Sequence, residues 1–492
     1  LANFRAGNWN TYQQLFGLNG LTAQQAGNFS ASEKQLAAFL QADWRPLNSL
    51  KLGLGLRWDR QEHPDFPILN YDQLTPTAVT PTNPNGKTAA LNQRIPNDAQ
   101  FSPRFSLTWT PEFDHGKSVL RFNVGRYVST TPSVFLYQAF TANAVRSASV
   151  TFNSTDSATY FIPRGGGDGA PVTGGGAFVP NDPFSFGTSI PAGATVPPAN
   201  VFTFSPNFKN PYTDRANLGV ERAFGDLVLG VSGTYARGKQ LERVYDTNLG
   251  TPVDNGSGRL VFTPPTAGGS NNRPNTYYRQ MAMYVSDAES IYHAYTVSLK
   301  YHKEGSALDA QLFYTLAYNK DNDSNERNFS SYSTANTQRL GDEWSWSDTD
   351  RRQTLTGYVS FTEPQTKLLT SLAMRYVTGF PYTLTVSGDR NNDGVSGNDR
   401  VYIGGVDTGR NTRRSSSILT FDLGLRRDFK LAKAVKLTAS MDVFNLLNRF
   451  DTYVRPVVAG ATDPATTLTD NQALATGVDS GRQVQLGLRV AF

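Results

Sequence analysis

A stretch rich in Asp, Asn and Gly is the most specific chemical signal in the sequence: GDRNNDGVSGNDRVY, residues 388–402. Its start matches a calcium-binding loop, in which oxygen-bearing side chains alternate along the chain and a Gly allows the sharp turn. The match ends at the last position of the calcium loop, which requires a bidentate Glu, because Arg400 occupies it and Asp399 lies one residue earlier. The candidate Ca²⁺ ligands are Asp389, Asn391, Asp393 and Asp399. A tight structural loop without an ion explains the composition equally well, so both interpretations stay open.

A second set of candidates combines aromatic rings with Arg in the long connections of the chain: Tyr277, Tyr278, Arg279, Trp344 and Trp346. Aromatic side chains and Arg are enriched where proteins recognise other molecules. We therefore expect these residues to contact a ligand, and the composition suits a peptide and a carbohydrate equally well. Packing within the loops is the alternative for any one of them.

The remaining motifs do not indicate an enzyme. The four His residues are far apart in sequence, and neither a Gly-x-Ser-x-Gly elbow nor a His-x-x-x-His metal pair occurs. The HGKS tetrapeptide at 115–118 lacks the first Gly of a phosphate-binding loop, since Pro111 occupies that position. An acidic cluster at Asp321, Asp323, Asn325 and Glu326 is typical of a solvated loop tip. We expect no catalytic residue.

Composition excludes several other classes. The 492 residues contain no Cys, which rules out disulfides, Cys-based zinc sites and thiol nucleophiles. The net charge of +5 comes without a dense Lys/Arg block, so we expect no nucleic-acid partner. No apolar run reaches the about 18 residues of a membrane-spanning helix. The chain starts at Leu1 without a signal peptide, so we expect it to be a fragment of a longer protein.

The elements that position these candidates are predicted from the alternation of apolar and polar residues with period two. In the last ten residues, Val484, Leu486 and Leu488 share one face, while Gln485 and Arg489 lie on the other. A strand of this kind fits a transmembrane β-strand of about 9–11 residues. The same pattern predicts about thirteen strands, near 35–44, 50–59, 101–110, 118–127, 213–224, 227–237, 291–303, 307–318, 351–362, 367–378, 417–428, 435–446 and 482–492.

The connections between these strands alternate in length. Short ones alternate with long ones at 60–100, 128–212, 238–290, 319–350, 379–416 and 447–481, and large aromatics cluster at both ends of the strands. Outer-membrane barrels have this plan, with short periplasmic turns, long extracellular loops and aromatic girdles. We therefore predict an all-β, transmembrane antiparallel β-barrel over 35–492, preceded by an extracellular loop segment at 1–34. A soluble all-β protein is the alternative, but it would not need an apolar stripe on nearly every strand.

The two faces of the predicted barrel have different partners. The apolar stripes should contact outer-membrane lipid. Inward-facing polar residues should line a wet lumen, and these are Arg121, Asn123, Arg375, Asp422, Arg426, Lys436, Asp442 and Arg489.

Four segments resemble the TonB-dependent outer-membrane receptors, and most closely their Oar-like branch, which carries a carboxypeptidase-regulatory domain. They are NPYTDRANLGVERAFGDLVLGVSGTYARGKQLERVYDTNL from Asn210, YHAYTVSLKYHKEGSALDAQLFYTLAYNKDND from Tyr292, DRRQTLTGYVSFTEP from Asp350 and FDLGLRRDFKLAKAVKLTASMDVFNLLNRFD from Phe421. The closing QLGLRVAF resembles the C-terminal strand that ends in Phe and is read by the barrel-assembly machinery. The FNLLNRF stretch at 444–450, together with Phe492, is the most specific part of the resemblance.

The resemblance implies a 22-stranded barrel with an N-terminal plug that couples to the inner-membrane TonB complex. No segment like a plug or a TonB box occurs before residue 35, so we expect the chain to be the C-terminal part of such a barrel. The implied function is energised uptake of a large or scarce solute across the outer membrane of a Gram-negative bacterium. A structural or adhesive barrel that binds partners through its loops, and a passive porin, are the alternatives.

Overall fold

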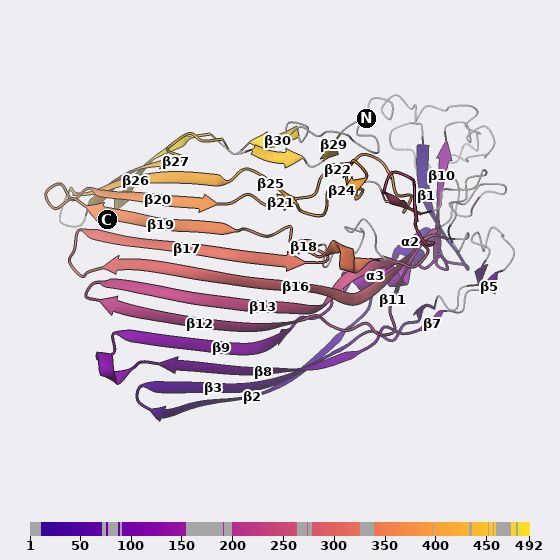
Figure 1. The fold of residues 1–492 in the computed structure, drawn as a ribbon, viewed down its shortest axis with the longest axis horizontal. Helices are drawn as coiled ribbons and strands as arrows, with labels where there is room; N and C mark the ends of the chain where they lie inside the picture. Colours follow the sequence, from indigo (N-terminus) through magenta and orange to yellow (C-terminus); the bar gives the residue numbers. More distant parts are fainter. Residues whose placement is uncertain are drawn as a thin grey trace.

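Thirteen consecutive antiparallel strands form one wide sheet in the computed structural model (Figure 1). The structure describes residues 11–70, 75–76, 87–88, 91–153, 190, 199–262, 273, 278–324, 339–395, 397–431, 435–450, 452–455, 457–458, 474–478 and 481–492. In order across the sheet the strands are β2 (Lys34–Leu47), β3 (Leu50–Glu62), β8 (Asp98–Trp109), β9 (Ser118–Val128), β12 (Tyr212–Phe224), β13 (Leu227–Asp246), β16 (Tyr278–His302), β17 (Leu308–Asp321), β19 (Gln353–Thr362), β20 (Leu369–Val377), β26 (Ile418–Lys430), β27 (Lys436–Phe444) and β31 (Gln483–Ala491). Each corresponds to one predicted segment, so the predicted fold class is confirmed.

The register of the sheet keeps apolar and polar residues on opposite faces. Leu229 of β13 lies opposite Leu299 of β16, which lies opposite Leu312 of β17, and all three belong to the apolar face. On the polar face, Glu221 of β12 accepts hydrogen bonds from Arg121 at 2.6 Å and from Lys300 at 3.0 Å. A sheet with one apolar face and one ion-paired face can place lipid on one side and water on the other.

Tight turns join the strands at one end of the sheet. Gly225, in the two-residue turn between β12 and β13, has a φ of +65°, which is costly for a residue with a Cβ. Among the residues that the structure describes, the corresponding connection between β2 and β3 is also two residues long. These turns fix the register, and the long connections all leave from the opposite end (Figure 1).

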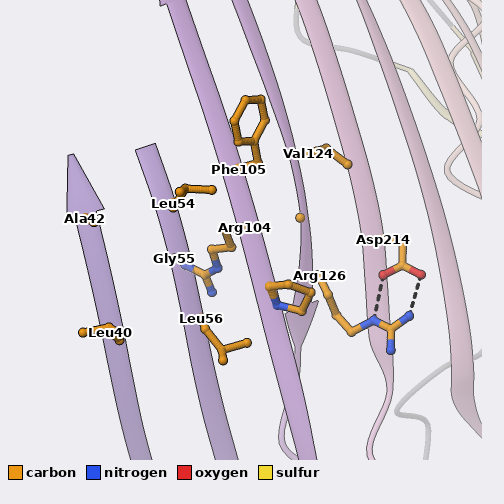
Figure 2. A pocket seen from close by; sticks show the side chains of 12 residues that line it. Leu40, Ala42, Leu54, Gly55, Leu56, Arg104, Phe105, Val124, Arg126 and Asp214 are labelled. Atoms are coloured by element: carbon orange, nitrogen blue, oxygen red, sulfur yellow. Dashed lines mark hydrogen bonds and ion pairs between the residues drawn. The ribbon is translucent and has the colours of Figure 1, made fainter. Parts of the chain in front are cut away.

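The apolar face carries a groove of about 680 Å³ across β2, β3, β8, β9 and β12 (Figure 2). Leu40, Leu54, Leu56 and Phe105 form much of its wall. The Arg126 guanidinium, which donates to Asp214 at 2.7 and 2.8 Å, lies beside this apolar surface.

Two strands continue well past the membrane. The sequence predicted loop from 238 to 290, but β13 is 20 residues long and β16 is 25, whereas about 9–11 residues cross a bilayer. β11 (Ala199–Phe204) pairs in parallel with the extension of β16. The predicted loop boundaries are therefore corrected here, because tertiary pairing prolongs the ladder beyond the alternating pattern.

The described residues of the long connections pack around a hydrophobic core. We call this packed unit, core and connections together, the cap. The Tyr284 ring packs on Phe135 of α3 (Val134–Thr141) and on Phe204 of β11, with ring centroids 4.8 and 4.9 Å apart. Ile68 and Ala282 are fully buried in the same cluster. The cap is therefore a packed unit with a core of its own, where the sequence indicated loops.

Short elements complete the described residues. They are β1 (Thr11–Gly17), α2 (Ala23–Gly27), β4 (Ile68–Leu69), β5 (Thr75–Pro76), β6 (Lys87–Thr88), β7 (Leu91–Gln93), η2 (Glu112–Asp114), β10 (Ser147–Asn153), β14 (Val253–Asp254), β15 (Leu260–Val261), η4 (Leu340–Glu343), β18 (Ser345–Trp346), β21 (Pro381–Tyr382), β22 (Thr385–Val386), β23 (Tyr402–Ile403), β24 (Val406–Asp407), β25 (Arg413–Arg414), β28 (Thr452–Arg455), β29 (Val457–Val458) and β30 (Leu474–Val478). β1 pairs with β10, so the predicted loop segment 1–34 contains a strand and a helix. No helix within the described ranges combines the length and the apolarity needed to cross a membrane.

Candidate functional site

The predicted ligand-contacting residues lie in different surroundings. Tyr277 falls outside the described residues. Tyr278 opens β16 but is only 1% exposed, because its ring packs with Leu69, Val201 and Met281 in the cap. In this conformation its ring is not available to a solute.

Arg279 and Trp344 are accessible at the surface of the cap. The Arg279 side chain is exposed and donates to the backbone carbonyl of Gly394 at 3.3 Å, next to the Asp-rich loop. Trp344 follows η4 and is 39% exposed. Trp346 belongs to β18, pairs with Lys320 of β17 and is half-buried.

The Asp-rich loop folds as a set of side-chain-to-backbone turns. The Asp389 carboxylate accepts hydrogen bonds from the backbone N–H groups of Asp393, at 3.1 Å, and Gly394, at 2.8 Å. The Asn391 amide oxygen also accepts from the Asp393 N–H, at 2.9 Å. Gly394 has a φ of +88°, and a Cβ there would meet the Arg273 guanidinium at 2.7 Å. The side-chain oxygens of Asp389 and Asn391 thus accept hydrogen bonds from within the loop, and glycine is favoured at its bend.

Burial dominates the electrostatics of this loop. It is the largest cause of a pKa of about 7 at Asp393; the carboxylates of Asp389 and Asp399 act in the same direction, and hydrogen bonds from Asn398 and the Val395 N–H oppose it. Burial also raises the pKa of Asp399 to about 6, against the opposing effects of the Arg390 N–H and the Arg259 guanidinium. Across the part of the chain that the structure describes, no group of three or more His, Cys, Asp or Glu side chains could hold a metal ion. The calcium site therefore stays a prediction.

Buried ion pairs between residues far apart in sequence join the long connections. They are Arg273–Asp246, Arg259–Asp399, Arg400–Glu343 and Arg410–Asp321; Arg400 also pairs with the half-buried Asp407 in its own connection, and we call these five pairs the loop network. Arg273 bonds to Asp246 at 2.8 Å and to the carbonyl of Asp393 at 2.6 Å, so it joins the β13 extension to the Asp-rich loop. Nothing local in the sequence marks these partners, and only their Arg-and-carboxylate composition hinted at pairing.

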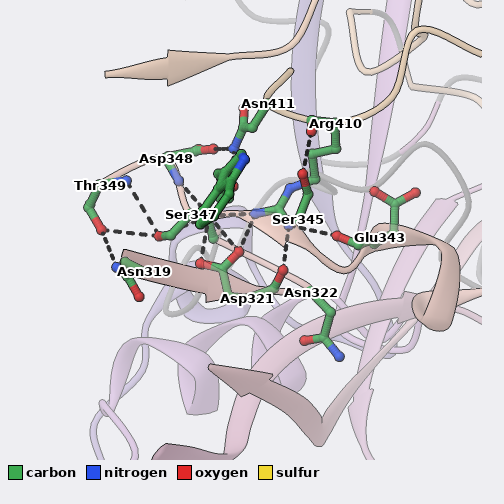
Figure 3. Close-up of polar contacts among 12 residues, drawn as sticks. Asn319, Asp321, Asn322, Glu343, Ser345, Ser347, Asp348, Thr349, Arg410 and Asn411 are labelled. Carbon is green, nitrogen blue, oxygen red and sulfur yellow. Dashed lines mark hydrogen bonds and ion pairs between the residues drawn. The ribbon is translucent and has the colours of Figure 1, made fainter. Parts of the chain in front are cut away.

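Arg410 lies at the centre of one part of the loop network (Figure 3). Its guanidinium donates to the carbonyls of Asp321, at 2.9 Å, and Glu343, at 2.8 Å, as well as to the Asp321 carboxylate. Ser345 donates to the Arg410 carbonyl at 2.5 Å. The acidic cluster that the sequence indicated as a solvated tip thus contributes Asp321 to a buried contact. We correct that prediction for Asp321 and for Asp323, which is 6% exposed; Asn325 and Glu326 lie outside the described residues.

A small polar cavity of about 70 Å³ lies inside the loop network. Glu343, Asp399 and Arg400 line it together with the rings of Phe262 and Tyr402. Burial raises the pKa of Glu343, while Arg400 and Arg410 oppose the shift. A cavity of this size fits water better than a solute, so we assign it to the support of the cap.

The polar face of the sheet forms a second candidate surface. A concavity of about 270 Å³ is lined by Arg121, Asn123, Asn217, Ser232 and Thr234. Thr234 donates to Asn217 at 2.9 Å, and the Arg121–Glu221–Lys300 contacts lie at one side. This face presents hydroxyls, amides and balanced charges, which suit passage or weak binding of a polar solute.

Three of the described His residues each contact a different side chain, and His115 lies at the end of η2. His63 pairs with Glu33 at 2.9 Å, and His302 pairs with Asp309 at 2.7 Å on the polar face. His293 stacks on Tyr318 with ring centroids 5.0 Å apart. None of these three contacts, within the described residues, joins a His to a hydroxyl nucleophile.

A wide antiparallel sheet with one lipid-compatible face, one polar face and a packed cap at the long-loop end defines a transmembrane β-barrel wall. The chain belongs to the outer membrane beta barrel domain family, whose model matches residues 1–408. It is accordingly a protein of the bacterial outer membrane. No curated protein matches the sequence.

Several solved structures are similar to the chain at low identity. The outer membrane transporter YddB from Escherichia coli is 13% identical with a TM-score of 0.48, over 93% of this chain and 54% of that one. The FrpB iron transporter from Neisseria meningitidis, F3-3 variant, is 11% identical with a TM-score of 0.45, over 94% and 45%. The ferric yersiniabactin uptake receptor FyuA from Yersinia pestis is 10% identical with a TM-score of 0.42, over 93% and 45%. The chain thus spans about half the length of these solved structures.

Proposed function

We propose that this chain forms part of the wall and the extracellular cap of a TonB-dependent receptor of the Oar-like branch, which takes up a large or scarce solute. The observation that carries the proposal is the packed cap: buried ion pairs hold the long connections in one arrangement above a polar lumen face. A pre-organised cap suits specific capture, because ordering costs are not incurred when the solute binds. A passive porin has no need of such a cap.

The partners belong to the same proposal. Coupling to the TonB complex would run through a plug outside these residues. The barrel-assembly machinery would read the C-terminal strand that ends in Phe492, whose side chain is 99% exposed in this structure. No chemical step is involved, so no catalytic residue is proposed.

Capture of the solute would involve the accessible residues of the cap. Arg279 and Trp344 remain our proposed contacts, since both are exposed beside the loop network. Tyr278 would support them from within the core, whereas Trp346 pairs with Lys320 on the lipid-facing side of the sheet.

The test compares nutrient depletion by cells that lack the gene with cells that carry the full-length protein. Mass spectrometry of spent medium should show at least one solute that only the complemented cells remove at low concentration. A protonophore should abolish this removal. Arg279→Ala combined with Trp344→Ala should lower it about tenfold at low solute and much less at saturation.

Other results would favour the alternatives. Removal that is linear in concentration and insensitive to the protonophore would indicate a porin. If deletion altered cell or surface attachment and no solute depended on the gene, an adhesive barrel would be the better description.

A further inference from the structure

A cluster of cations and aromatic rings lies at the long-loop end of β16 and β17, and we call it the rim cluster. It consists of His293, Tyr318, Lys320, Trp346 and Arg352. The Arg352 guanidinium lies 4.3 Å from the Tyr318 ring centroid and 4.1 Å from that of Trp346. The Lys320 ammonium lies 4.5 Å from the Trp346 centroid. Two cations are therefore held against aromatic faces.

The register places His293, Tyr318, Lys320 and Trp346 on the lipid side of the wall, and the Arg352 guanidinium joins them through its contacts with the Tyr318 and Trp346 rings. Tyr318 continues the stripe of Leu312 and Leu316 on β17 and lies opposite His293, which continues the stripe of Leu299 on β16. Trp346 lies opposite Lys320, two residues beyond Tyr318. Asp321 has the opposite parity and points into the loop network. The rim cluster thus faces away from the lumen and away from the proposed solute contacts.

Its height corresponds to the membrane boundary. β17 is 14 residues long, and about 9–11 residues of such a strand cross the hydrocarbon. Lys320 lies one residue from the end of β17, beyond that span as counted from the short turn. The long-loop end of an outer-membrane barrel faces the cell exterior. The cations therefore lie at the level of the headgroups of the outer leaflet.

The cations of the rim cluster are only partly paired with carboxylates of the described residues. Among the described residues, no carboxylate pairs with Lys320. Arg352 reaches Asp350 only at 3.4 Å, and the same carboxylate oxygen accepts from Arg414. The Lys320 ammonium therefore has no described carboxylate as a partner, and Arg352 shares its single one with Arg414.

We propose that the rim cluster is a binding site for the phosphorylated headgroup of an outer-leaflet glycolipid. Phosphate oxygens would accept from the Lys320 ammonium and the Arg352 guanidinium, and Trp346 and Tyr318 would hold both cations in place and contact the sugar. The bilayer itself supplies this occupant, since the site lies on the lipid-facing surface at headgroup depth. An aromatic girdle without lipid preference would not need two cations stacked on the same ring.

The experiment measures binding of diphosphoryl lipid A to the full-length receptor in nanodiscs of phosphatidylcholine, by native mass spectrometry. Lys320→Gln with Arg352→Gln should weaken binding about tenfold, and Lys320→Arg should retain it. Arg427→Gln is the matched control, because Arg427 lies over Phe429, 4.8 Å from its centroid, on the same face at the short-turn end. The affinity of the Arg427→Gln variant for diphosphoryl lipid A should equal that of the wild type. Heat-modifiable gel mobility shows that each variant is folded.

A comparison of ligands keeps the test decisive even where a variant fails to fold. The wild-type receptor should bind dephosphorylated lipid A about tenfold more weakly than the diphosphoryl form, and added salt should weaken the latter. Equal binding of the two lipids, or an unchanged affinity in the folded double variant, would overturn the proposal. If inorganic phosphate bound as tightly as the lipid, the glycolipid would be excluded as the specific occupant. None of these outcomes bears on solute uptake, so this proposal and the proposed function can fail separately.

Discussion

At the scale of single residues, the Asp-rich loop shows how far local sequence reaches. Alternating Asp and Asn around a Gly predicted a curled loop, and Asp389 and Gly394 do form its turn. The contact from Arg273 was not predictable, because its partner carbonyl on Asp393 lies 120 positions away. Local patterns give a turn its shape, but they do not reveal which distant side chain will bury its carboxylates.

The raised pKa values of Asp393 and Asp399 predict that this loop depends on pH. Both folded pKa values, about 7 and about 6, lie above the ordinary Asp value of 3.8. The resulting stabilisation is fully present below about pH 4 and is lost as pH rises through 6 to 7. Hydrogen exchange of 388–402, corrected for the intrinsic rate, should therefore be slower at pH 5 than at pH 8. Asp393→Asn should flatten this dependence, and an unchanged profile in that variant would contradict the assignment.

Calcium titration separates the two interpretations of the same loop. We expect no binding heat when Ca²⁺ is added to the full-length receptor at pH 8, because the oxygens of Asp389, Asn391 and Asp393 already accept from backbone N–H groups. Isothermal titration is the measurement. Heat that disappears in Asp393→Asn would instead establish a calcium site and reverse our preference for the structural loop.

At the scale of elements, the thirteen strands were predictable because period-two alternation is a local property of each strand. The β13 and β16 extensions were not, since Val244 and Ala282 are buried in the core of the cap and not by lipid. The parallel pairing of β11 with β16 joins residues such as Phe204 and Tyr284, which no local pattern connects. Strands that a membrane requires were visible in the sequence, whereas those built by tertiary packing were not.

Removal of Arg410 should loosen the cap and leave the barrel wall intact. Arg410→Ala would leave the Asp321 carboxylate buried without its cation and the Glu343 carbonyl without its donor, and the loss of one partner of a buried pair costs about 3–5 kcal/mol. Limited proteolysis should then cut the 319–350 and 379–416 connections faster, while heat-modifiable mobility stays unchanged. Arg339→Ala is the matched control, because its pair with Asp342 is exposed and is worth about 0–1 kcal/mol. Equal protease resistance in both variants would show that the loop network does not hold the cap.

At the scale of the whole molecule, the polar face must stay wet and the apolar face must stay in lipid. The register enforces this separation across the sheet, from Leu54 on β3 to Leu486 next to Met441 on β27. The sequence predicted these two environments correctly, because a shift by one residue would exchange every side chain between them. It could not reveal how the long connections are arranged in the cap, since that arrangement depends on ion pairs and strand pairings between residues far apart in sequence.

From the two edges of the sheet we can predict whether this chain forms a closed barrel in a membrane by itself. Within the described residues, β2 and β31 are the outer strands of the sheet, and no ladder joins them. Phe39 on β2 and Leu486 on β31 are 74% and 76% exposed, so no other described residue covers these side chains of the two edge strands. Unpaired backbone N–H and C=O groups are not tolerated in hydrocarbon, so both edges need partner strands.

Residues 1–492 produced alone should therefore fail to form a barrel that resists sodium dodecyl sulfate. Co-expression with the remaining part of the full-length protein as a separate fragment should restore heat-modifiable mobility, because its strands would pair with β2 and β31. A cysteine pair placed across a restored edge would report the pairing directly, since the chain contains no Cys of its own. A stable, protease-resistant barrel formed by these residues alone would instead mean that β2 and β31 can pair with each other, and a smaller closed wall would replace the larger one that we propose.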